Sequence, residues 1–209
     1  MSDTLVTSRR AYAAWLEGDT DRSVKYLPVF SSIQGPSAPA PLAGRQRRLL
    51  VFGAPANRMR VYARSHAELR DAAVALGTDE VLDVGPPPGA APPAGVKSVG
   101  ILPAAKLSRL LADSLAAFID YFPAYLSKST VFAAYCAHGI LPVCPRDAAS
   151  EADGLVGGQH DLLSRARAVG AHRLQEIADS ARRWYATHDL RVDGQVFGAA
   201  LRAGRGTGS

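Results

Sequence analysis

The sequence predicts an α/β fold in which a doubly wound parallel sheet is followed by C-terminal helices. The first observation is a series of short, continuous apolar runs that end in glycine or a turn, as strands buried on both faces of a parallel sheet do. The second is that helical patterns separate these runs, which is typical of βαβ units with right-handed crossovers. The third is size, because 209 residues with 47% hydrophobic content can bury a substantial core.

Residues 1–44 are expected to hold a helix, an extended segment and a linker. Apolar residues recur at helical spacing from Leu5 to Leu16, and Glu17-Gly18-Asp19 supplies a helix stop. The segment from Val24 to Phe30 is expected to be extended, and its proline favours an edge strand or the entry to a linker. The segment from Ser31 to Gly44 is rich in Pro, Ala, Ser and Gly without periodicity, so an irregular connection is expected there.

Residues 45–158 are predicted to form the main α/β domain. Five strands are expected, at Arg48–Gly53, Glu80–Gly85, Val96–Ile101, Ala117–Phe122 and Ile140–Val143. Helical segments are expected between them, from the turn at Ala54–Arg58 to Leu76, from Pro103 to about Ala116, and from Ser129 to His138. Proline at a first helical position and glycine just past the last one set these boundaries.

Residues 159–202 are predicted to form C-terminal helices that have no strands between them. A long basic helix is expected from Gln159 to the segment Trp184–His188, and a short one from Gln195 to Arg202. The glycine-rich segment 203–209 is predicted to be a disordered tail.

The formal net charge of +5 is unevenly distributed along the chain. Between Leu42 and Arg70 the sequence carries seven arginines and a single glutamate. No aromatic interleaving and no recognised nucleic-acid motif accompany these arginines. The pattern therefore favours the phosphate groups of a small ligand, or a protein partner, over DNA or RNA.

Two cysteines, Cys136 and Cys144, lie in apolar surroundings, and no CxxC spacing or His/Cys cluster indicates a metal site. We therefore expect buried free thiols, no bound metal and a reducing, cytoplasmic location. No apolar run is long enough to cross a bilayer and no signal-peptide pattern follows Met1. Any membrane contact is expected to be peripheral.

Candidate ligand-binding residues follow the predicted strands, because ligands of a doubly wound sheet lie beyond the carboxyl ends of its strands. Gly53, Asn57 and Arg58 follow the first strand of the main domain. Glycine there permits close approach of the backbone to a ligand, and the planar guanidinium of Arg58 can grip phosphate oxygens.

A second candidate group, Lys128, Ser129 and Thr130, follows the fourth predicted strand at the start of a helix. A helix N-terminus has unpaired backbone N–H groups and a partial positive charge, and Lys128 adds a full charge. A diphosphate group is therefore the leading ligand.

Each candidate also has a structural interpretation. Ser and Thr are ordinary helix caps, and Arg58 and Arg60 could form a solvated helix start. Asp83 fits a turn former at the end of a strand, and His138 fits a cation at a helix C-terminus. The acids of the loop that begins at Pro145, Asp153 among them, fit solvated capping residues.

Neither a GxGxxG fingerprint nor a P-loop motif occurs in the chain. Three segments instead resemble the C-terminal, donor-binding half of a GT-B glycosyltransferase, near the glycogen-synthase-like retaining group. They are Leu50–Gly53 with Asn57-Arg58, Tyr125–Gly139 and Trp184–His188. The resemblance extends from about Val6 to Leu201 and implies a single Rossmann-like half of that fold.

The resemblance implies a UDP-sugar or GDP-sugar donor as substrate and no tightly bound cofactor. It implies that Arg58, and Lys128 with Ser129, hold the diphosphate, so that these cations replace a metal. It places the base and ribose beside the end of the third strand, at Gly100, Ile101 and Leu102.

The sequence departs from the family pattern in two ways. Many retaining members carry a glutamate near the start of the helix that Ser129 opens and another a turn or two later, and here those places hold Ser, Thr and Ala. The segment from Met1 to Gly18 resembles only the end of an acceptor-binding domain. The chain is therefore expected to be the donor half of a two-chain glycosyltransferase, a truncated piece of one, or a non-catalytic nucleotide-binding or protein-interaction module derived from one.

Overall fold

The computed structural model describes residues 4–146, 151–164 and 169–203. Within these residues the main body is a six-stranded sheet with the order β5-β4-β3-β6-β7-β8, and every neighbouring pair is parallel. The strands are β3 (Gln46–Phe52), β4 (Glu80–Val84), β5 (Val96–Gly100), β6 (Ser114–Phe118), β7 (Leu141–Cys144) and β8 (Leu162–Leu163). The strand order reverses between β3 and β6, so the predicted doubly wound α/β class is confirmed.

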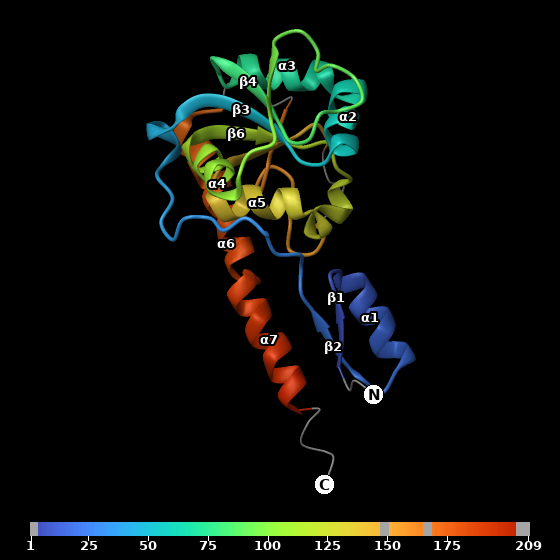
Figure 1. Ribbon diagram of the computed structural model, residues 1–209. Helices are drawn as coiled ribbons and strands as arrows, with labels where there is room; N and C mark the ends of the chain where they lie inside the picture. Colours follow the sequence, from blue (N-terminus) through green and yellow to red (C-terminus); the bar gives the residue numbers. More distant parts are fainter. Residues whose placement is uncertain (1–3, 147–150, 165–168, 204–209) are drawn as a thin grey trace.

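Helices cover both faces of this sheet (Figure 1). They are α2 (Pro55–Arg64), α3 (His66–Ala75), α4 (Ala104–Asp113), α5 (Thr130–His138) and α6 (Ala171–Ala186). Because side chains alternate along a strand, Leu49 of β3 packs with Val61 of α2 and Leu69 of α3, while Leu50 packs with residues of α4 and α5. The core therefore has two layers, one on each side of the sheet.

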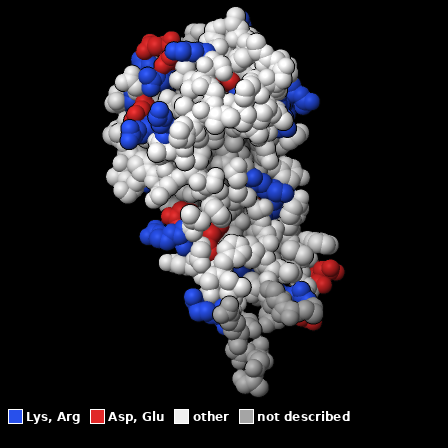
Figure 2. Space-filling view, in the orientation of Figure 1, with Lys and Arg blue, Asp and Glu red and all other residues white. Residues whose placement is uncertain are grey.

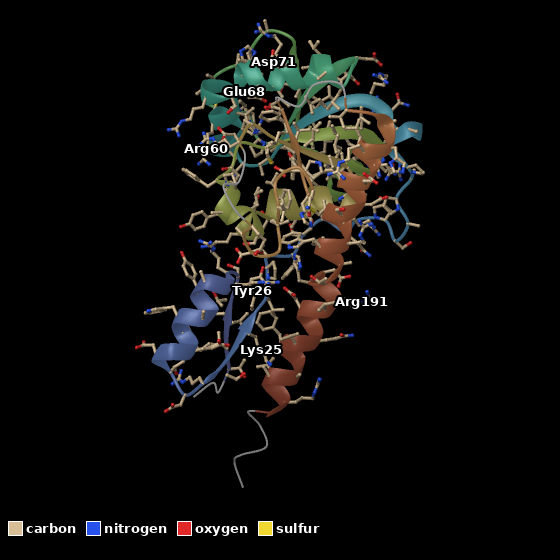
Figure 3. All side chains as sticks on the ribbon, turned by 180° about the vertical axis from the view of Figure 1, so that it is seen from behind. Lys25, Tyr26, Arg60, Glu68, Asp71 and Arg191 are labelled. Carbon is tan, nitrogen blue, oxygen red and sulfur yellow. The ribbon has the colours of Figure 1, made fainter. Side chains whose placement is uncertain are left out.

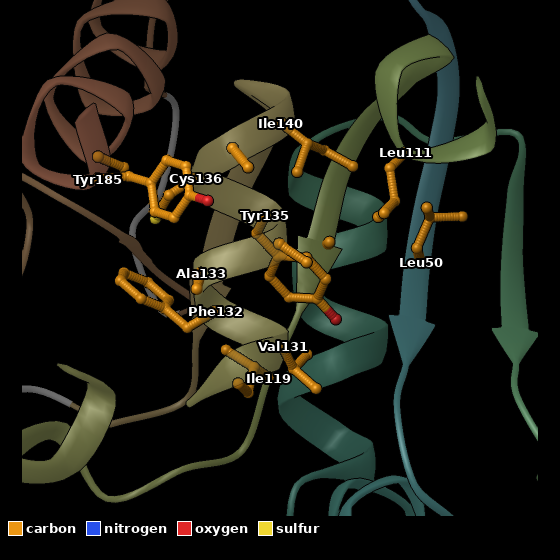
Figure 4. Close-up of a cluster of buried hydrophobic side chains, with 14 of the residues drawn as sticks. Leu50, Leu111, Ile119, Val131, Phe132, Ala133, Tyr135, Cys136, Ile140 and Tyr185 are labelled. Atoms are coloured by element: carbon orange, nitrogen blue, oxygen red, sulfur yellow. The ribbon is translucent and has the colours of Figure 1, made fainter. Parts of the chain in front are cut away.

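Helix α5 is buried on all sides, as its uniformly apolar sequence dictates. Every residue from Val131 to His138 is buried, and Figure 4 shows part of the cluster around it. The hydroxyl of Tyr135 donates to the carbonyl of Phe118, 3.2 Å away, which satisfies a polar group in this core. The helix ends at Gly139, whose φ of +58° is the left-handed conformation expected after a helix.

The segment between residues 27 and 45 packs tightly on the main body although it is irregular. Gly35 lies against α5 so closely that an added Cβ would be 2.1 Å from the carbonyl oxygen of Ala137. Arg182 of α6 donates to the carbonyls of Ser37 and Ala137, each 2.7 Å away. The segment ends in a 3-10 turn, η1 (Leu42–Gly44). We call it the strap, because it is fixed on the main body and is not a free linker.

A second unit projects from the main body (Figures 1 and 3). It consists of β1 (Thr4–Thr7), α1 (Arg10–Asp19) and β2 (Ser23–Tyr26), in which the two strands pair in parallel. Helix α7 (Leu190–Ala203) extends from the same side, and both views show it beside this unit. The only buried residue of the β1-α1-β2 unit within the described chain is Ala13.

Several predicted boundaries are wrong for local physical reasons. The expected helix from Leu5 begins as β1, because Leu5 and Val6 pair with Val24 and Lys25. The long helical segment after Ala54 is two helices that meet at Ser65, and the expected turn at Ala54–Arg58 is already the start of α2.

The fourth strand of the main domain is shifted toward the N-terminus. It begins at Ser114 rather than Ala117, since the run of small residues there fits the middle of the sheet between β3 and β7. It also ends at Phe118, and Pro123 opens a 3-10 helix, η2 (Pro123–Lys128), before α5.

The C-terminal part departs further from expectation. A strand, β8, pairs Leu162 with Val143 where only helix was expected, and the long helix begins at Ala171 instead of Gln159. The last helix is longer than expected, because α7 begins at Leu190 and includes Ala203. The rest of the expected tail, 204–209, lies outside the described residues.

Candidate functional site

The candidate site is built at the carboxyl edge of the main sheet, where β3 and β6 lie side by side and the chain turns into α2 and α5. Gly53 ends β3 with a φ of +135°, and a Cβ there would lie 3.0 Å from the side chain of Val131 on α5. Glycine therefore lets the turn pass directly beside the start of α5. Asn57, on the first turn of α2, is half-buried at the same edge.

Arg58 is buried at this edge, so the alternative expectation of a solvated helix start is wrong for this residue. Its side chain is fully buried, and its three guanidinium nitrogens donate to oxygens of Asp83, Gly53 and Pro86. The contact with Asp83 joins Nη1 to Oδ2 at 2.5 Å, and the contact with Gly53 joins Nε to the carbonyl at 2.9 Å. Arg58 thus connects the turns after β3 and β4, and each of its three nitrogens donates a hydrogen bond within the protein.

Asp83 is the buried ion-pair partner of Arg58. This carboxylate was interpreted as a turn former, but it is fully buried in β4 beside β3, where its register partner is Val51. It also accepts a hydrogen bond from the hydroxyl of Tyr62, and burial together with this bond raises the pKa of Tyr62. A buried carboxylate needs a cation, and Arg58 is the one within reach.

The start of α5 combines a helix cap with open polar groups. Ser129 is the N-cap, and its hydroxyl accepts a hydrogen bond of 3.1 Å from the backbone N–H of Phe132. Lys128 and Thr130 on either side are exposed. The ammonium of Lys128, at the end of η2, lies 5.7 Å from the centre of the Tyr12 ring on α1. The cation is therefore directed toward the projecting unit.

The end of β5 holds the residues expected beside a base and ribose. Gly100 has a φ of +77°, Ile101 is 70% exposed and Leu102 is half-buried. Leu102 lines an open groove of about 470 Å³ between β5 and α4, together with Lys97 and Lys106. Because β4 and β3 separate β5 from β6, these residues lie at the outer end of the carboxyl edge, away from Lys128.

Asp153 joins the candidate site to the projecting unit, a role that its sequence context did not indicate. Its carboxylate accepts hydrogen bonds from the hydroxyl of Ser127 at 2.6 Å, the backbone N–H of Arg10 at 2.8 Å and the side chain of Arg9 at 3.3 Å. Its carbonyl accepts from Tyr26 and Trp184, each at 3.0 Å. Burial and the charge of Asp153 raise the pKa of Tyr26 to about 12. Asp153 was expected to be a solvated loop acid, but it is buried and connects η2 to the projecting unit.

Asp120 is a further polar residue that the sequence did not single out. It lies two residues after the end of β6, is 2% exposed, and accepts a hydrogen bond from the hydroxyl of Ser65 at 3.0 Å. Arg146 lies 3.3 Å from its other oxygen. A carboxylate just after an apolar strand was the available signal, but Ser65 and Arg146 are far from it in sequence.

Cys136, Cys144 and His138 are buried in the core of the main body. Cys136 and Cys144 are buried free thiols as predicted, and burial raises the pKa of both. His138 is fully buried between the carbonyl of Ala134 and the hydroxyl of Ser108. Burial lowers its pKa, so the expected cationic helix cap is wrong.

Three further features of the described residues are the distribution of basic side chains (Figure 2), the grouping of metal-binding side chains and the apolarity of the helices. On the face shown in Figure 2, Lys and Arg atoms form separate patches instead of a continuous basic surface. No group of three or more His, Cys, Asp or Glu side chains gathers among the described residues as metal ligands would. Of the described helices, none has the length and apolarity that a membrane span requires.

Known structures share this architecture. A GtfA/B complex matches with a TM-score of 0.63 and 13% sequence identity, over 96% of this chain and 45% of that one. AviGT4, a glycosyltransferase of avilamycin A biosynthesis, matches with a TM-score of 0.55 and 17% identity, over 96% of this chain and 65% of the other. Pneumococcal O-GlcNAc transferase GtfA, solved with UDP and GlcNAc, matches with a TM-score of 0.57 and 8% identity, over 96% and 45%.

These likenesses establish the fold alone. The chain has the architecture of one half of a GT-B glycosyltransferase, and it spans about half the length of the GtfA/B and pneumococcal GtfA structures. No protein-family model matches the sequence, and no curated protein matches it.

Proposed function

We propose that this chain, which has the fold of one half of a GT-B glycosyltransferase, binds a nucleoside diphosphate sugar and serves as the donor-binding half of a glycosyltransferase. The ligand would lie at the carboxyl edge of the sheet, against the start of α5. The sugar would pass to an acceptor held by a second body, which is either another segment of a longer chain or a partner protein. The GtfA/B complex among the similar structures is an assembly of two named components.

The observation that carries the proposal is the exposure of Lys128 and Thr130 at the N-terminus of α5, beside the reversal of strand order. The reversal is where a doubly wound sheet binds its ligand, and the helix start offers donors and a partial positive charge. Lys128 adds a cation that lies near the Tyr12 ring and forms no ion pair with any carboxylate among the described residues. Gly53 lets the turn after β3 lie directly against Val131 at the start of α5.

In such a reaction the glycosidic bond to the diphosphate breaks and negative charge develops on the leaving group. Lys128 and the helix N-terminus would offset this charge. Arg58, with all three nitrogens bonded inside the protein, is not assigned this role. We propose that Arg58 holds the turns at Gly53 and Gly85 together. These turns pass close to each other, since a Cβ on Gly85 would lie 2.5 Å from the carbonyl of Gly53.

The projecting parts of the molecule support the need for a second body. A two-stranded parallel sheet is marginal by itself, because parallel sheets are normally covered on both faces. Trp15 of α1 is 67% exposed, and Leu190 and Leu201 of α7 are 57% and 68% exposed. Of residues 190–202 in helix α7, only Asp193 is buried. We propose that the acceptor-binding body packs against these elements.

Calorimetric titration of the whole chain with UDP and GDP tests the donor site. We expect binding of at least one of them, and we expect Lys128→Ala to weaken it by about ten-fold or more, because a charge-assisted contact to phosphate is lost. Lys25→Ala is the matched control, since Lys25 is an exposed lysine on β2. Absence of heat with both nucleotides at millimolar concentration would overturn the proposal.

The second candidate is a non-catalytic nucleotide-binding or protein-interaction module derived from a glycosyltransferase. The observation that favours it is the start of α5, where Ser129, Thr130 and the following residues include no carboxylate. Recovery of an acceptor-domain chain with the protein in a pull-down, together with sugar transfer by the pair, would favour the split enzyme. Recovery of a partner whose binding is unchanged by Lys128→Ala, without transfer, would favour the module.

A further inference from the structure

A buried carboxylate with an unused oxygen lies at the reversal of strand order. Asp120 is 2% exposed, and its Oδ1 accepts no hydrogen bond from any described residue. The neighbouring Oδ2 accepts from Ser65 at 3.0 Å and from Nη2 of Arg146 at 3.5 Å. A buried carboxylate oxygen without a hydrogen-bond donor is costly, so a group that supplies one at this position would be bound favourably.

The crevice beside Asp120 fits such a group. It is lined by Asn57 at the start of α2, Val131 at the start of α5, and Asp120 and Tyr121 at the end of β6. It leaves about 10 Å³ for the centre of a water molecule, which is room for about one water. One hydroxyl group has the size of one water, whereas a phosphate group does not fit.

The surroundings of Asp120 keep its charge compensated while leaving Oδ1 without a hydrogen bond. Nη2 of Arg146 lies 3.3 Å from Oδ1, and the guanidinium is 5.6 Å from the centre of the Phe122 ring. The Arg146 side chain is 38% exposed, whereas that of Asp120 is 1% exposed. Arg146 is thus the more solvent-exposed partner of the carboxylate.

We infer that Asp120 is a specificity-determining residue that accepts a hydrogen bond from one hydroxyl group of a sugar in the ligand. The inference rests on the proposed function, because that function places a nucleoside diphosphate sugar at this edge. The hydroxyl is either the 2′-hydroxyl of the ribose or a hydroxyl of the transferred sugar. Phosphate is held elsewhere, at Lys128 and the start of α5, since a carboxylate repels it.

A subsite of this kind discriminates against ligands that lack the hydroxyl. A site built to hydrogen-bond a hydroxyl rejects the deoxy analogue strongly, because the buried oxygen is then left without a donor. The wild-type chain is therefore expected to bind the deoxy form of the recognised sugar at least about ten-fold more weakly than the parent compound.

The test compares UDP, 2′-deoxy-UDP and UDP-glucose by calorimetry, with the corresponding guanosine compounds in parallel. Asp120→Asn keeps the size of the side chain but replaces one carboxylate oxygen and removes the charge. Ser65→Ala removes one of the two hydrogen bonds to Oδ2, leaves that from Arg146, and controls for a merely structural effect. Asp79→Asn, at an exposed aspartate just before β4, controls for net charge.

If the ribose hydroxyl is recognised, Asp120→Asn weakens UDP and UDP-glucose by about ten-fold or more but leaves 2′-deoxy-UDP unchanged. If the transferred sugar is recognised, the variant weakens UDP-glucose alone. Both control variants are expected to bind within about three-fold of the wild type. The wild-type comparison of parent and deoxy compounds stands by itself if Asp120→Asn does not fold.

Equal binding of UDP, 2′-deoxy-UDP and UDP-glucose by the wild type, or unchanged binding by a folded Asp120→Asn, would overturn the inference and leave the donor site intact. Absence of binding of every nucleotide to the wild type would overturn the proposed function, and the inference with it.

Discussion

The pair formed by Arg58 and Asp83 shows how a residue typical of a ligand site can serve the fold instead. Both side chains are fully buried, and the arginine also bonds to the carbonyls of Gly53 and Pro86. Burying the pair costs desolvation free energy, but removing one partner costs more, because an uncompensated charge remains in the interior. The pair therefore fixes the geometry of two turns that border the proposed site.

Arg58→Met is expected to lower the free energy of unfolding by about 3–5 kcal/mol, because Asp83 is left buried without its cation. Arg60→Met, two residues along the same helix and only half-buried, is expected to change it by less than about 0.5 kcal/mol. Urea denaturation followed by circular dichroism measures both. Equal effects of the two substitutions would contradict the assigned role of Arg58.

His188 is a residue-scale source of acid sensitivity. It is 1% exposed, its ring lies 4.3 Å from that of Trp184, and its Nε2 has no hydrogen-bond partner among the described residues. Burial lowers its pKa from 6.5 to about 4. The folded state therefore binds fewer protons than the unfolded state between these values, so stability is retained above pH 6.5 and lost as the pH falls toward 4.

His188→Phe keeps an aromatic ring and cannot titrate. Between pH 6.5 and pH 4, the free energy of unfolding of the wild type is expected to fall relative to this variant by up to about 3 kcal/mol. His172→Phe, whose side chain is 90% exposed, is the control and should leave the slope unchanged. Parallel pH profiles for the wild type and His188→Phe would show that the buried imidazole does not produce the effect.

At the scale of elements, the strap between residues 27 and 45 closes over α5 because one glycine permits it. A Cβ on Gly35 would lie 2.1 Å from the carbonyl oxygen of Ala137, and backbone atoms cannot give way as a flexible side chain does. Gly35→Ala is expected to destabilise the fold by about 1–3 kcal/mol. Gly44→Ala, where no heavy atom lies within 4 Å of the added carbon, should be close to neutral in the same thermal melts.

Elements with a purely local signal could be predicted from the sequence. Strand β3 is a continuous apolar run and α5 is an apolar helix closed by Gly139, and both lie within two residues of their expected places. Strand β8 could not be predicted, because two residues carry no periodic pattern and Leu162 is in a strand only through its pairing with Val143.

The residues of the candidate site also differ in whether a local sequence signal predicts them. Ser129 opens a helix because a hydroxyl N-cap is a local feature, and Lys128 and Thr130 lie beside it as expected. The pairing of Arg58 with Asp83 could not be predicted, because Asp83 is 25 residues away and is brought beside it by the pairing of β3 with β4. Asp120 and Asp153 owe their environments to partners that are still more distant in the sequence.

At the scale of the whole molecule, one well-packed sheet carries two sparsely packed appendages. The main body holds the two layers of the core, whereas the β1-α1-β2 unit and α7 keep large apolar side chains exposed. Asp153 attaches that unit to η2, directly beside the start of α5. The geometry thus places the proposed donor site where the main body meets the surface that a second body would cover.

The most direct test of the central claim is a titration of the ¹⁵N-labelled chain with UDP, and separately with GDP, followed by amide chemical shifts. The proposed site predicts that the largest changes cluster at Asn57 and at Lys128 to Val131, on the carboxyl edge of the sheet. Amides at the opposite edge, such as those of Gly77 and Asp113, should be unaffected. Changes confined to that opposite edge, or none with either nucleotide, would contradict a nucleoside diphosphate site at the start of α5.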